Sequence, residues 1–246
     1  MQEYKKKVIG VFPTVRIEEE SHPYHKRYEF IIHYSHKIYE CGAIPIGLVL
    51  DNGHINEEQL ALCDAFLLPG GQRIDKSVYE LLIYAYKNKK PILGICMGMQ
   101  TLTIFSIILD NLKDKELTID NVLNTYYEIT KNDPIITKIS NGEIHDVLLD
   151  KEPISKAHHK LEISENSLFY KIYNSKVIDI ICLHNYQVSR VGSLFDIVGK
   201  SPGGVIEAIE STNKDLFWIG TQFHPETNPS DKIVKYFIDI IGDKNV

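Results

Sequence analysis

Short apolar runs alternate with longer helical patterns through the first half of the chain. The apolar runs predict strands at residues 7–12, 44–50, 65–68 and 92–95. Apolar positions at helical spacing predict helices at residues 26–41, 56–63, 75–89 and 97–108. Strands that alternate with helices of this length form βαβ units. We therefore expect an α/β fold with a mainly parallel central sheet flanked by helices.

The second half of the chain follows a different pattern. Residues 110–140 are polar and have only a weak helical period. Short strand candidates then follow at residues 144–149, 160–163, 177–183, 195–199, 205–209 and 217–222, and an amphipathic helix is predicted at 230–241. There is no internal repeat and no low-complexity linker, so the pattern predicts one domain over residues 1–246.

Composition and charge exclude several classes of protein. The 246 residues are 43% hydrophobic and 24% charged, as in ordinary globular proteins. The 27 basic and 33 acidic residues give a net charge of −6, so no basic excess is present to neutralise a nucleic-acid backbone. The apolar run at 8–12 is too short for a signal-peptide core, and no run approaches the roughly 18 apolar residues that cross a bilayer. We expect a cytoplasmic protein with neither a nucleic-acid nor a membrane partner.

The cysteine pattern does not indicate a metal site or a disulfide framework. The four cysteines lie far apart and form no Cys-x-x-Cys pair. Three of them, Cys41, Cys63 and Cys182, are interpreted as core packing. The fourth, Cys96, stands in a distinctive context.

Cys96 lies in Gly94-Ile95-Cys96-Met97-Gly98, where a fully apolar predicted strand meets a predicted helix. This is the arrangement of a nucleophile elbow, with cysteine in place of serine. Bulk two residues away on either side would clash, and the amino end of the following helix favours a thiolate. A buried structural cysteine is the commoner fate of a free thiol, so this pattern alone leaves the two interpretations evenly matched.

A second pattern offers a base and a group to orient it. The predicted strand at 217–222 leads into Phe223-His224-Pro225-Glu226. Because His224 and Glu226 are two residues apart, extended geometry would place both on one side of the chain. Glu226 could then hold one imidazole nitrogen while the other faces Cys96. In isolation, a surface His and Glu in a turn is the more frequent arrangement.

A third pattern, Pro69-Gly70-Gly71, follows the predicted strand at 65–68. Glycines there let backbone N–H groups approach an oxyanion, although a plain strand-to-helix turn has the same composition. All three patterns fall at the carboxyl end of a predicted strand, which is the edge where open α/β sheets bind ligands. Their coincidence favours a single site.

Taken in order, Leu68-Pro69-Gly70-Gly71, the segment from Gly94 to Gln100, and Phe223-His224-Pro225-Glu226 resemble the class I glutamine amidotransferase-like hydrolases. The segments 43–46, 157–170, 182–185 and 201–210 are further similar to the branch of γ-glutamyl-γ-aminobutyrate hydrolases. The match spans about residues 8–241. It implies a flavodoxin-like architecture with a nucleophile elbow.

By position, this resemblance implies roles for individual residues. Cys96 is implied as the nucleophile, His224 as the general base and acid, and Glu226 as the group that orients the imidazole. The implied oxyanion hole consists of the backbone N–H groups of Gly71 and Met97. The residues implied to contact the substrate, or to border its pocket, are Gln100, His184, Asn185 and Tyr186.

The implied reaction is hydrolysis of a γ-glutamyl amide through a thioester. It releases glutamate and a small amine such as γ-aminobutyrate, and it needs no metal and no organic cofactor. One alternative is a glutaminase subunit that delivers ammonia to a separate synthetase partner. A second is a non-catalytic binding protein on the same fold. The leaving amine and the oligomeric state do not follow from the sequence, and a homodimer is left open.

Three departures from the branch's pattern bear on the substrate pocket. Met97 stands where the branch usually has arginine, and the loop after Gly71 reaches its helix quickly. Extra residues, at about 108–140, precede Asn141-Gly142-Glu143-Ile144-His145-Asp146-Val147, which looks like the family's glycine-rich segment. These differences predict a rebuilt pocket lid and leave the identity of the substrate open.

Overall fold

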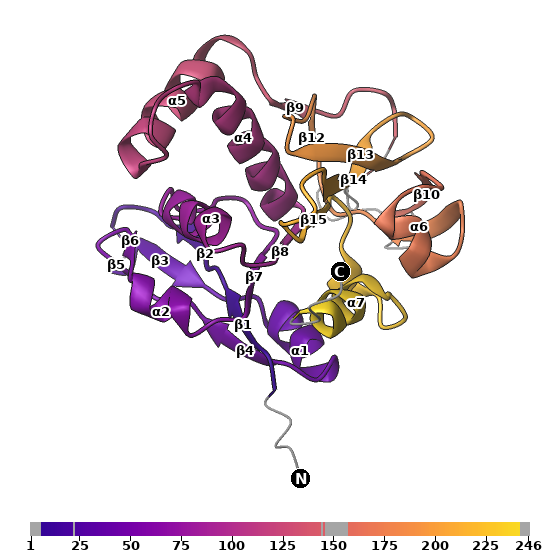
Figure 1. Ribbon diagram of the computed structural model, residues 1–246, viewed down its shortest axis with the longest axis horizontal. Helices are drawn as coiled ribbons and strands as arrows, with labels where there is room; N and C mark the ends of the chain where they lie inside the picture. The colour runs from indigo at the N-terminus through magenta and orange to yellow at the C-terminus, as the bar shows by residue number, and fades with distance from the viewer. Residues whose placement is uncertain (1–5, 22, 144, 146–156, 242–246) are drawn as a thin grey trace.

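The computed structural model describes residues 6–21, 23–143, 145 and 157–241. Its centre is a nine-stranded sheet in the order β11-β10-β13-β14-β15-β8-β7-β1-β4 (Figure 1). Strands from both halves of the chain alternate with flanking helices, so the α/β class predicted from the sequence is confirmed.

Five adjacent strands of this sheet run parallel. They are β4 (Ile44–Gly47), β1 (Val8–Val11), β7 (Ala65–Leu68), β8 (Ile92–Ile95) and β15 (Trp218–Thr221). Because β8 lies between β7 and β15 and is parallel to both, the segments that follow these three strands leave the sheet at the same edge. The three motifs identified in the sequence all lie at that edge.

Four further strands extend the sheet beyond β15 with antiparallel pairing. They are β14 (Ile206–Ser211), β13 (Phe195–Lys200), β10 (His158–Ile163) and β11 (Val177–Ile181). The short helix α6 (Leu168–Tyr173) connects β10 to β11 and is capped by the Ser167 hydroxyl, which accepts the Tyr170 N–H at 3.0 Å. This helix is absent from the sequence prediction.

Each face of the parallel half packs against its own layer of helices. Along β7, Ala65 and Leu67 enter one hydrophobic core, and Phe66 and Leu68 enter the other, as the two-residue period of a strand requires. The first core is closed by α1 (Ile32–Glu40) and α7 (Ile233–Ile240), and the second by α3 (Val78–Lys87) and α4 (Met97–Leu112). Strands covered on both faces are apolar throughout, which explains the continuous apolar runs at 65–68 and 92–95.

The helix predicted at residues 26–41 is wrong in its first part. Residues 26–29 form β3 (Lys26–Glu29), which pairs with β2 (Thr14–Ile17), and α1 begins only at Ile32. The hairpin satisfies these backbone groups, and Arg27 forms ion pairs with Glu18 and Glu29 at 2.8 Å each. Tertiary pairing therefore overrides a local helical period.

Other boundaries differ in smaller ways. The predicted strand at 44–50 divides into β4 and the two-residue β5 (Leu50–Asp51), which pairs with β6 (His54–Ile55). The helix predicted at 56–63 is α2 (Glu57–Ala61), with Asn56 accepting the Glu58 N–H at 2.7 Å as its amino-terminal cap. Apart from His145, the strand predicted at 144–149 lies outside the described residues.

The polar segment at 108–140 contains the end of α4, the helix α5 (Ile119–Asn132) and the strand β9 (Ile136–Lys138). Helix α5 lies against α4 and α3, where the Tyr126 ring contacts Tyr79 at a centroid distance of 5.7 Å (Figure 1). Strand β9 pairs with β12 (Tyr186–Val188), so the extra segment ends beside residues implied to line the pocket. No helix in the described part of the chain is long and apolar enough to cross a membrane.

Candidate active site

Cys96 occupies a strained turn between β8 and α4. Its φ of +52° and ψ of −108° are unusual for a residue with a side chain, and such strain persists only where the surroundings enforce it. The Cys96 N–H donates to the Thr221 carbonyl at 2.6 Å, and the Cys96 carbonyl accepts the Gln100 N–H at 3.1 Å. These bonds fix the thiol, in a residue 7% exposed, at the amino end of a 16-residue helix.

The glycines around Cys96 are required by close backbone approaches, as predicted. A Cβ atom at Gly94 would lie 2.8 Å from the Gly98 carbonyl carbon. One at Gly98 would overlap the Leu68 carbonyl oxygen. The elbow therefore packs directly against the end of β7, which brings the Pro69-Gly70-Gly71 loop to the cysteine.

His224 lies beside both of these elements. A Cβ atom at Gly70 would lie 2.9 Å from His224 Cε1 and 3.1 Å from Cys96 Cβ. His224 Nδ1 is 2.7 Å from Glu226 Oε1, and both side chains are less than 10% exposed. The predicted contact is thus present, but extended geometry does not produce it. Residues Pro225–Thr227 form the 3₁₀ turn η2, because proline starts such a turn readily and the Thr227 hydroxyl donates to the His224 carbonyl at 2.7 Å.

The His224 imidazole is held in its protonated form. Burial lowers its pKa, but the Glu226 carboxylate and the Cys96 sulfur outweigh burial and raise the pKa to about 10. Nδ1 is taken by Glu226. Nε2 is buried and makes no hydrogen bond of normal geometry with any described residue. It is therefore available to Cys96 and to a ligand. An imidazolium beside a cysteine favours the thiolate form of the sulfur.

The predicted oxyanion donors, Gly71 and Met97, are neighbours. A Cβ atom at Gly71 would lie 3.4 Å from Met97 Cε. The N–H of the preceding residue, Gly70, already donates to the Tyr34 hydroxyl at 2.9 Å, so Gly71 is the candidate donor from this loop. Burial and the nearby Glu226 carboxylate hold the pKa of Tyr34 well above its ordinary value. Sequence reasoning missed Tyr34, because nothing local to α1 marks it as a neighbour of the site.

The structure brings Gln100 and Tyr186 together. Gln100 Nε2 donates to Gln222 Oε1 at 3.1 Å and reaches the Tyr186 carbonyl at 3.4 Å. Asn185 is half-buried, and its carbonyl accepts the Ile139 N–H at 2.9 Å. A cavity of about 160 Å³ opens beside Met97 and Gln100. Its walls come from α3, α4, α5 and β9, including Tyr79, Ile104, Tyr126 and Ile136.

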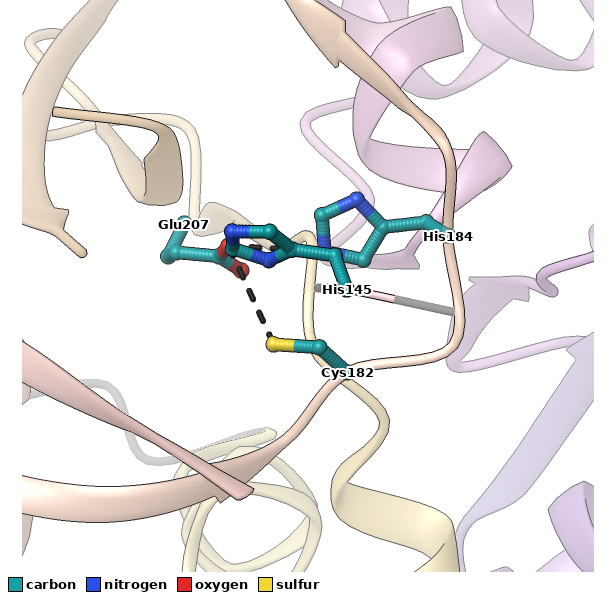
Figure 2. A group of neighbouring side chains, drawn as sticks. All are labelled: His145, Cys182, His184 and Glu207. Atoms are coloured by element: carbon teal, nitrogen blue, oxygen red, sulfur yellow. Dashed lines mark hydrogen bonds and ion pairs between the residues drawn. The ribbon is translucent and has the colours of Figure 1, made fainter. Parts of the chain in front are cut away.

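His184 lies in a different environment from the other predicted pocket residues. It is buried, and its Nε2 is 3.4 Å from the Glu207 carboxylate in a cluster that also contains His145 and Cys182 (Figure 2). The interpretation of Cys182 as simple core packing is therefore incomplete, because its sulfur lies 3.9 Å from Glu207 Oε1. Sequence reasoning missed this cluster: its members come from separate segments, and only the Cys182-Leu183-His184 spacing is local.

A family model described as Peptidase C26 matches residues 73–226, which is more than half of the chain and includes Cys96, His224 and Glu226. The chain belongs to the Peptidase C26 family. Membership places it among the class I glutamine amidotransferase-like proteins, as the sequence motifs predicted. The γ-glutamyl-γ-aminobutyrate branch stays a prediction.

Individual relatives agree with this membership. The chain is 27% identical to a glutamine amidotransferase-like protein of Rickettsia prowazekii, over 90% of this chain and 92% of that protein. It is 32% identical to the CTP synthase of Sulfolobus acidocaldarius over 65% of this chain, but it spans only 30% of that protein. A crystal structure from Thermoplasma acidophilum, described as that of a GMP synthase subunit, aligns over 98% of this chain and 96% of that chain. Its TM-score of 0.60 at 16% identity shows a shared fold.

Proposed function

We propose that this Peptidase C26 member hydrolyses a γ-glutamyl amide through a thioester on Cys96 and releases glutamate. The observation that carries the proposal is the convergence of three segments at one sheet edge. A strained, buried cysteine at a helix amino terminus meets a His224–Glu226 pair with a 2.7 Å contact, and the Gly70-Gly71 loop packs against both. These are the nucleophile, the oriented base and the oxyanion donors that acyl transfer requires.

The proposed reaction proceeds in two steps. The Cys96 thiolate attacks the γ-carbonyl carbon, and the oxyanion accepts hydrogen bonds from the N–H groups of Gly71 and Met97. The His224 Nε2 proton moves to the leaving nitrogen, so the C–N bond breaks and a free amine departs. Neutral His224 then takes a proton from water. The resulting hydroxide attacks the thioester, and glutamate leaves as the Cys96 thiolate is restored.

Glu226 acts throughout as the orienting group. Its carboxylate accepts the His224 Nδ1 proton and stabilises the imidazolium, which directs Nε2 toward the sulfur and the leaving nitrogen. Tyr34 keeps the Gly70 peptide in place. The chemistry of each step is thus assigned to groups of this chain alone.

We infer the size of the substrate from the cavity beside Met97 and Gln100, whose lining does not include Cys96 or His224. Its volume of about 160 Å³ is small for a ligand site and suits a γ-glutamyl head group held near Gln100. The Lys76 ammonium lies over the Tyr126 and Tyr127 rings, at 5.4 and 3.9 Å from their centroids, on the wall supplied by α5. The Asp75 carboxylate lines the same cavity, so the charges of its wall do not select the leaving amine.

The second candidate is a glutaminase subunit whose ammonia is used by a separate synthetase. One observation that favours it is the similarity to CTP synthases: the chain covers 30% of the length of the Sulfolobus protein and 38% of the length of the Methanosphaera protein. Another is the fold shared with the GMP synthase subunit from Thermoplasma. A third candidate, a non-catalytic binding protein, would give Cys96, His224 and Glu226 no role in bond cleavage.

A substrate panel separates these candidates. The purified protein is incubated with L-glutamine, γ-glutamyl-γ-aminobutyrate and γ-glutamyl peptides, and glutamate release is measured by mass spectrometry. Hydrolysis of γ-glutamyl amines without any added protein supports the first candidate. Release from glutamine alone, and only when a synthetase is added, supports the second and overturns the first. No release from any substrate, with the protein folded by circular dichroism, supports the third.

A further inference from the structure

A second cluster of chemically active side chains lies outside the proposed triad. It consists of His145, Cys182, His184 and Glu207, whose potential ligand atoms all lie within 4.8 Å of one another. The His145, His184 and Glu207 side chains are 1%, 2% and 0% exposed, and Cys182 is fully buried. Figure 2 shows the two imidazoles and the thiol gathered around the Glu207 carboxylate.

Hydrogen bonds at the outer side of each imidazole fix which nitrogen is engaged away from the cluster and which one faces it. His184 Nδ1 is 3.0 Å from the Tyr186 carbonyl, which can only accept, so Nδ1 carries the proton. His145 Nε2 is 3.1 Å from the Glu143 carboxylate and donates to it in the same way. The nitrogens left facing inward are His184 Nε2 and His145 Nδ1. Metal-binding histidines are oriented by this kind of outer hydrogen bond.

The inward atoms have no hydrogen-bond partner of their own. His145 Nδ1 and His184 Nε2 lie 3.2 and 3.4 Å from Glu207 Oε1, yet neither nitrogen makes a hydrogen bond of normal geometry with a described residue. Glu207 Oε2 is likewise unpartnered among the described groups. Buried polar atoms without hydrogen-bond partners cost free energy. A cation coordinated by these atoms removes that cost.

We propose that these four side chains bind one Zn²⁺ ion. Tetrahedral zinc with ligand bonds of about 2.0–2.3 Å has ligand-to-ligand separations of about 3.3–3.8 Å. The separations from Glu207 Oε1 are 3.2 Å to His145, 3.4 Å to His184 and 3.9 Å to Cys182. Zinc accepts this mixture of thiolate, imidazole and carboxylate, whereas magnesium and calcium select oxygen ligands.

The charges of this site also balance. On binding, the Cys182 thiol releases its proton to solvent, so one thiolate, one carboxylate and two neutral imidazoles surround a divalent ion. The net charge of the centre is zero, which suits a fully buried position. The sequence predicts no metal here, because Cys182 and His184 are the only two of the four ligands that lie close together in the chain.

The zinc site is structural, and it stabilises the segment that is hydrogen-bonded to His224 of the proposed triad. Four protein ligands fill a tetrahedral ion, which leaves no position for a substrate. The ligand segments are tied to one another and to the base: the His184 N–H donates to the His145 carbonyl at 2.8 Å, and the His224 N–H donates to the Ile181 carbonyl at 2.9 Å. The zinc therefore holds in place the segment around Ile181, which accepts the hydrogen bond from the His224 N–H. This inference stands whether or not the proposed function is correct.

Metal analysis of the full-length protein tests the proposal. Protein produced in zinc-supplemented medium is gel-filtered and measured by inductively coupled plasma mass spectrometry, with about one Zn²⁺ per chain expected. Cys182→Ser is expected to lower the zinc content at least tenfold. Cys63→Ser, which changes a buried thiol in the other hydrophobic core, is the matched control and is expected to retain the metal. Folding of each variant is checked by circular dichroism.

A measurement on the unaltered protein guards against variants that fail to fold. Zinc X-ray absorption is expected to report one sulfur and three nitrogen or oxygen neighbours, and Co²⁺ substitution is expected to give a thiolate charge-transfer band that persists in Cys96→Ser. Folded protein that holds less than about a tenth of an equivalent of zinc, even after incubation with Zn²⁺, would overturn the proposal. So would a sulfur-free zinc spectrum, or loss of the cobalt band in Cys96→Ser, which would place the metal at the nucleophile.

Discussion

At the scale of single residues, the protonation of His224 connects folding to the proposed chemistry. Its imidazole is buried between a carboxylate and a sulfur, and their attraction raises its pKa to about 10 despite burial. A protonated imidazole beside the sulfur is the partner that a cysteine nucleophile needs before substrate arrives. The same arrangement makes the stability of the fold depend on pH.

The sign of that dependence follows from proton binding. In the unfolded chain His224 titrates near 6.5, and in the folded chain near 10, so between these values only the folded state holds the proton. Stability from this group is complete below pH 6.5 and is lost as pH rises toward 10, with a slope of up to about 1.4 kcal/mol per pH unit. Urea unfolding of the parent and of His224→Gln from pH 6 to pH 10 measures it. Equal slopes for the two proteins would contradict the raised pKa.

Gly98 gives a second prediction at this scale, based on steric contact. A methyl group there would meet the Leu68 carbonyl, so Gly98→Ala is expected to destabilise the fold by about 1–3 kcal/mol and to reduce turnover, since the elbow must move. Gly42→Ala is the control, because its φ of +94° imposes backbone strain in otherwise open space and costs about 1 kcal/mol. Chemical denaturation measures both. A Gly98→Ala variant with unchanged stability and turnover would show that the approach to β7 is not required.

At the scale of elements, the segment that the sequence marks as extra becomes one wall of the cavity. Helix α5 supplies Tyr126, and β9 supplies Ile136 and pairs with the strand that begins at Tyr186. Substrate preference in this chain is therefore expected to reside in α5 and β9, away from the bond-breaking groups. Sequence alone located the segment but not its packing, because its helical period is weak and its partners lie in α3, α4 and β12.

Two substitutions in α5 test this assignment. Tyr126→Ala removes part of the cavity wall and is expected to raise KM for the preferred γ-glutamyl amine about tenfold while changing kcat less than threefold. Glu128→Ala changes an exposed residue of the same helix that does not line the cavity and is expected to leave both constants within about twofold. Steady-state kinetics on two substrates with different leaving amines measures the effect. An equal effect of both variants on KM would contradict a specific role for the wall.

At the scale of the whole molecule, the sequence predicted the α/β class and the motifs that meet at the sheet edge. Those predictions succeeded because strand ends and glycine contacts are local features of the sequence. Gly94 and Gly98 flank the cysteine, and the adjacent parallel strands β7, β8 and β15 bring the three motifs to the same edge. Tyr34, the zinc cluster and the β2–β3 hairpin escaped prediction. Each depends on contacts between segments that no local period records.

The sheet also predicts how the molecule unfolds. β15, from the last part of the chain, pairs with β8, from the first half, at the centre of the sheet. Neither half of the chain can therefore form the site on its own. We propose that residues 1–246 are one domain and expect a single cooperative thermal transition. Trp218 is the only tryptophan and is buried in β15, so its fluorescence reports the centre while circular dichroism reports the whole. Two separate transitions would contradict a single domain.

The central claim is that Cys96 forms the covalent intermediate, and rapid-quench mass spectrometry tests it most directly. Enzyme mixed with a good γ-glutamyl substrate is quenched in acid during turnover, and its mass and peptides are measured beside the rate of glutamate release. We expect one γ-glutamyl group on the Cys96 peptide, and a loss of release of at least about 10³-fold in Cys96→Ala, with Cys63→Ser unaffected. Glutamate release by Cys96→Ala at the parent rate, or an adduct on a different residue, would contradict the claim.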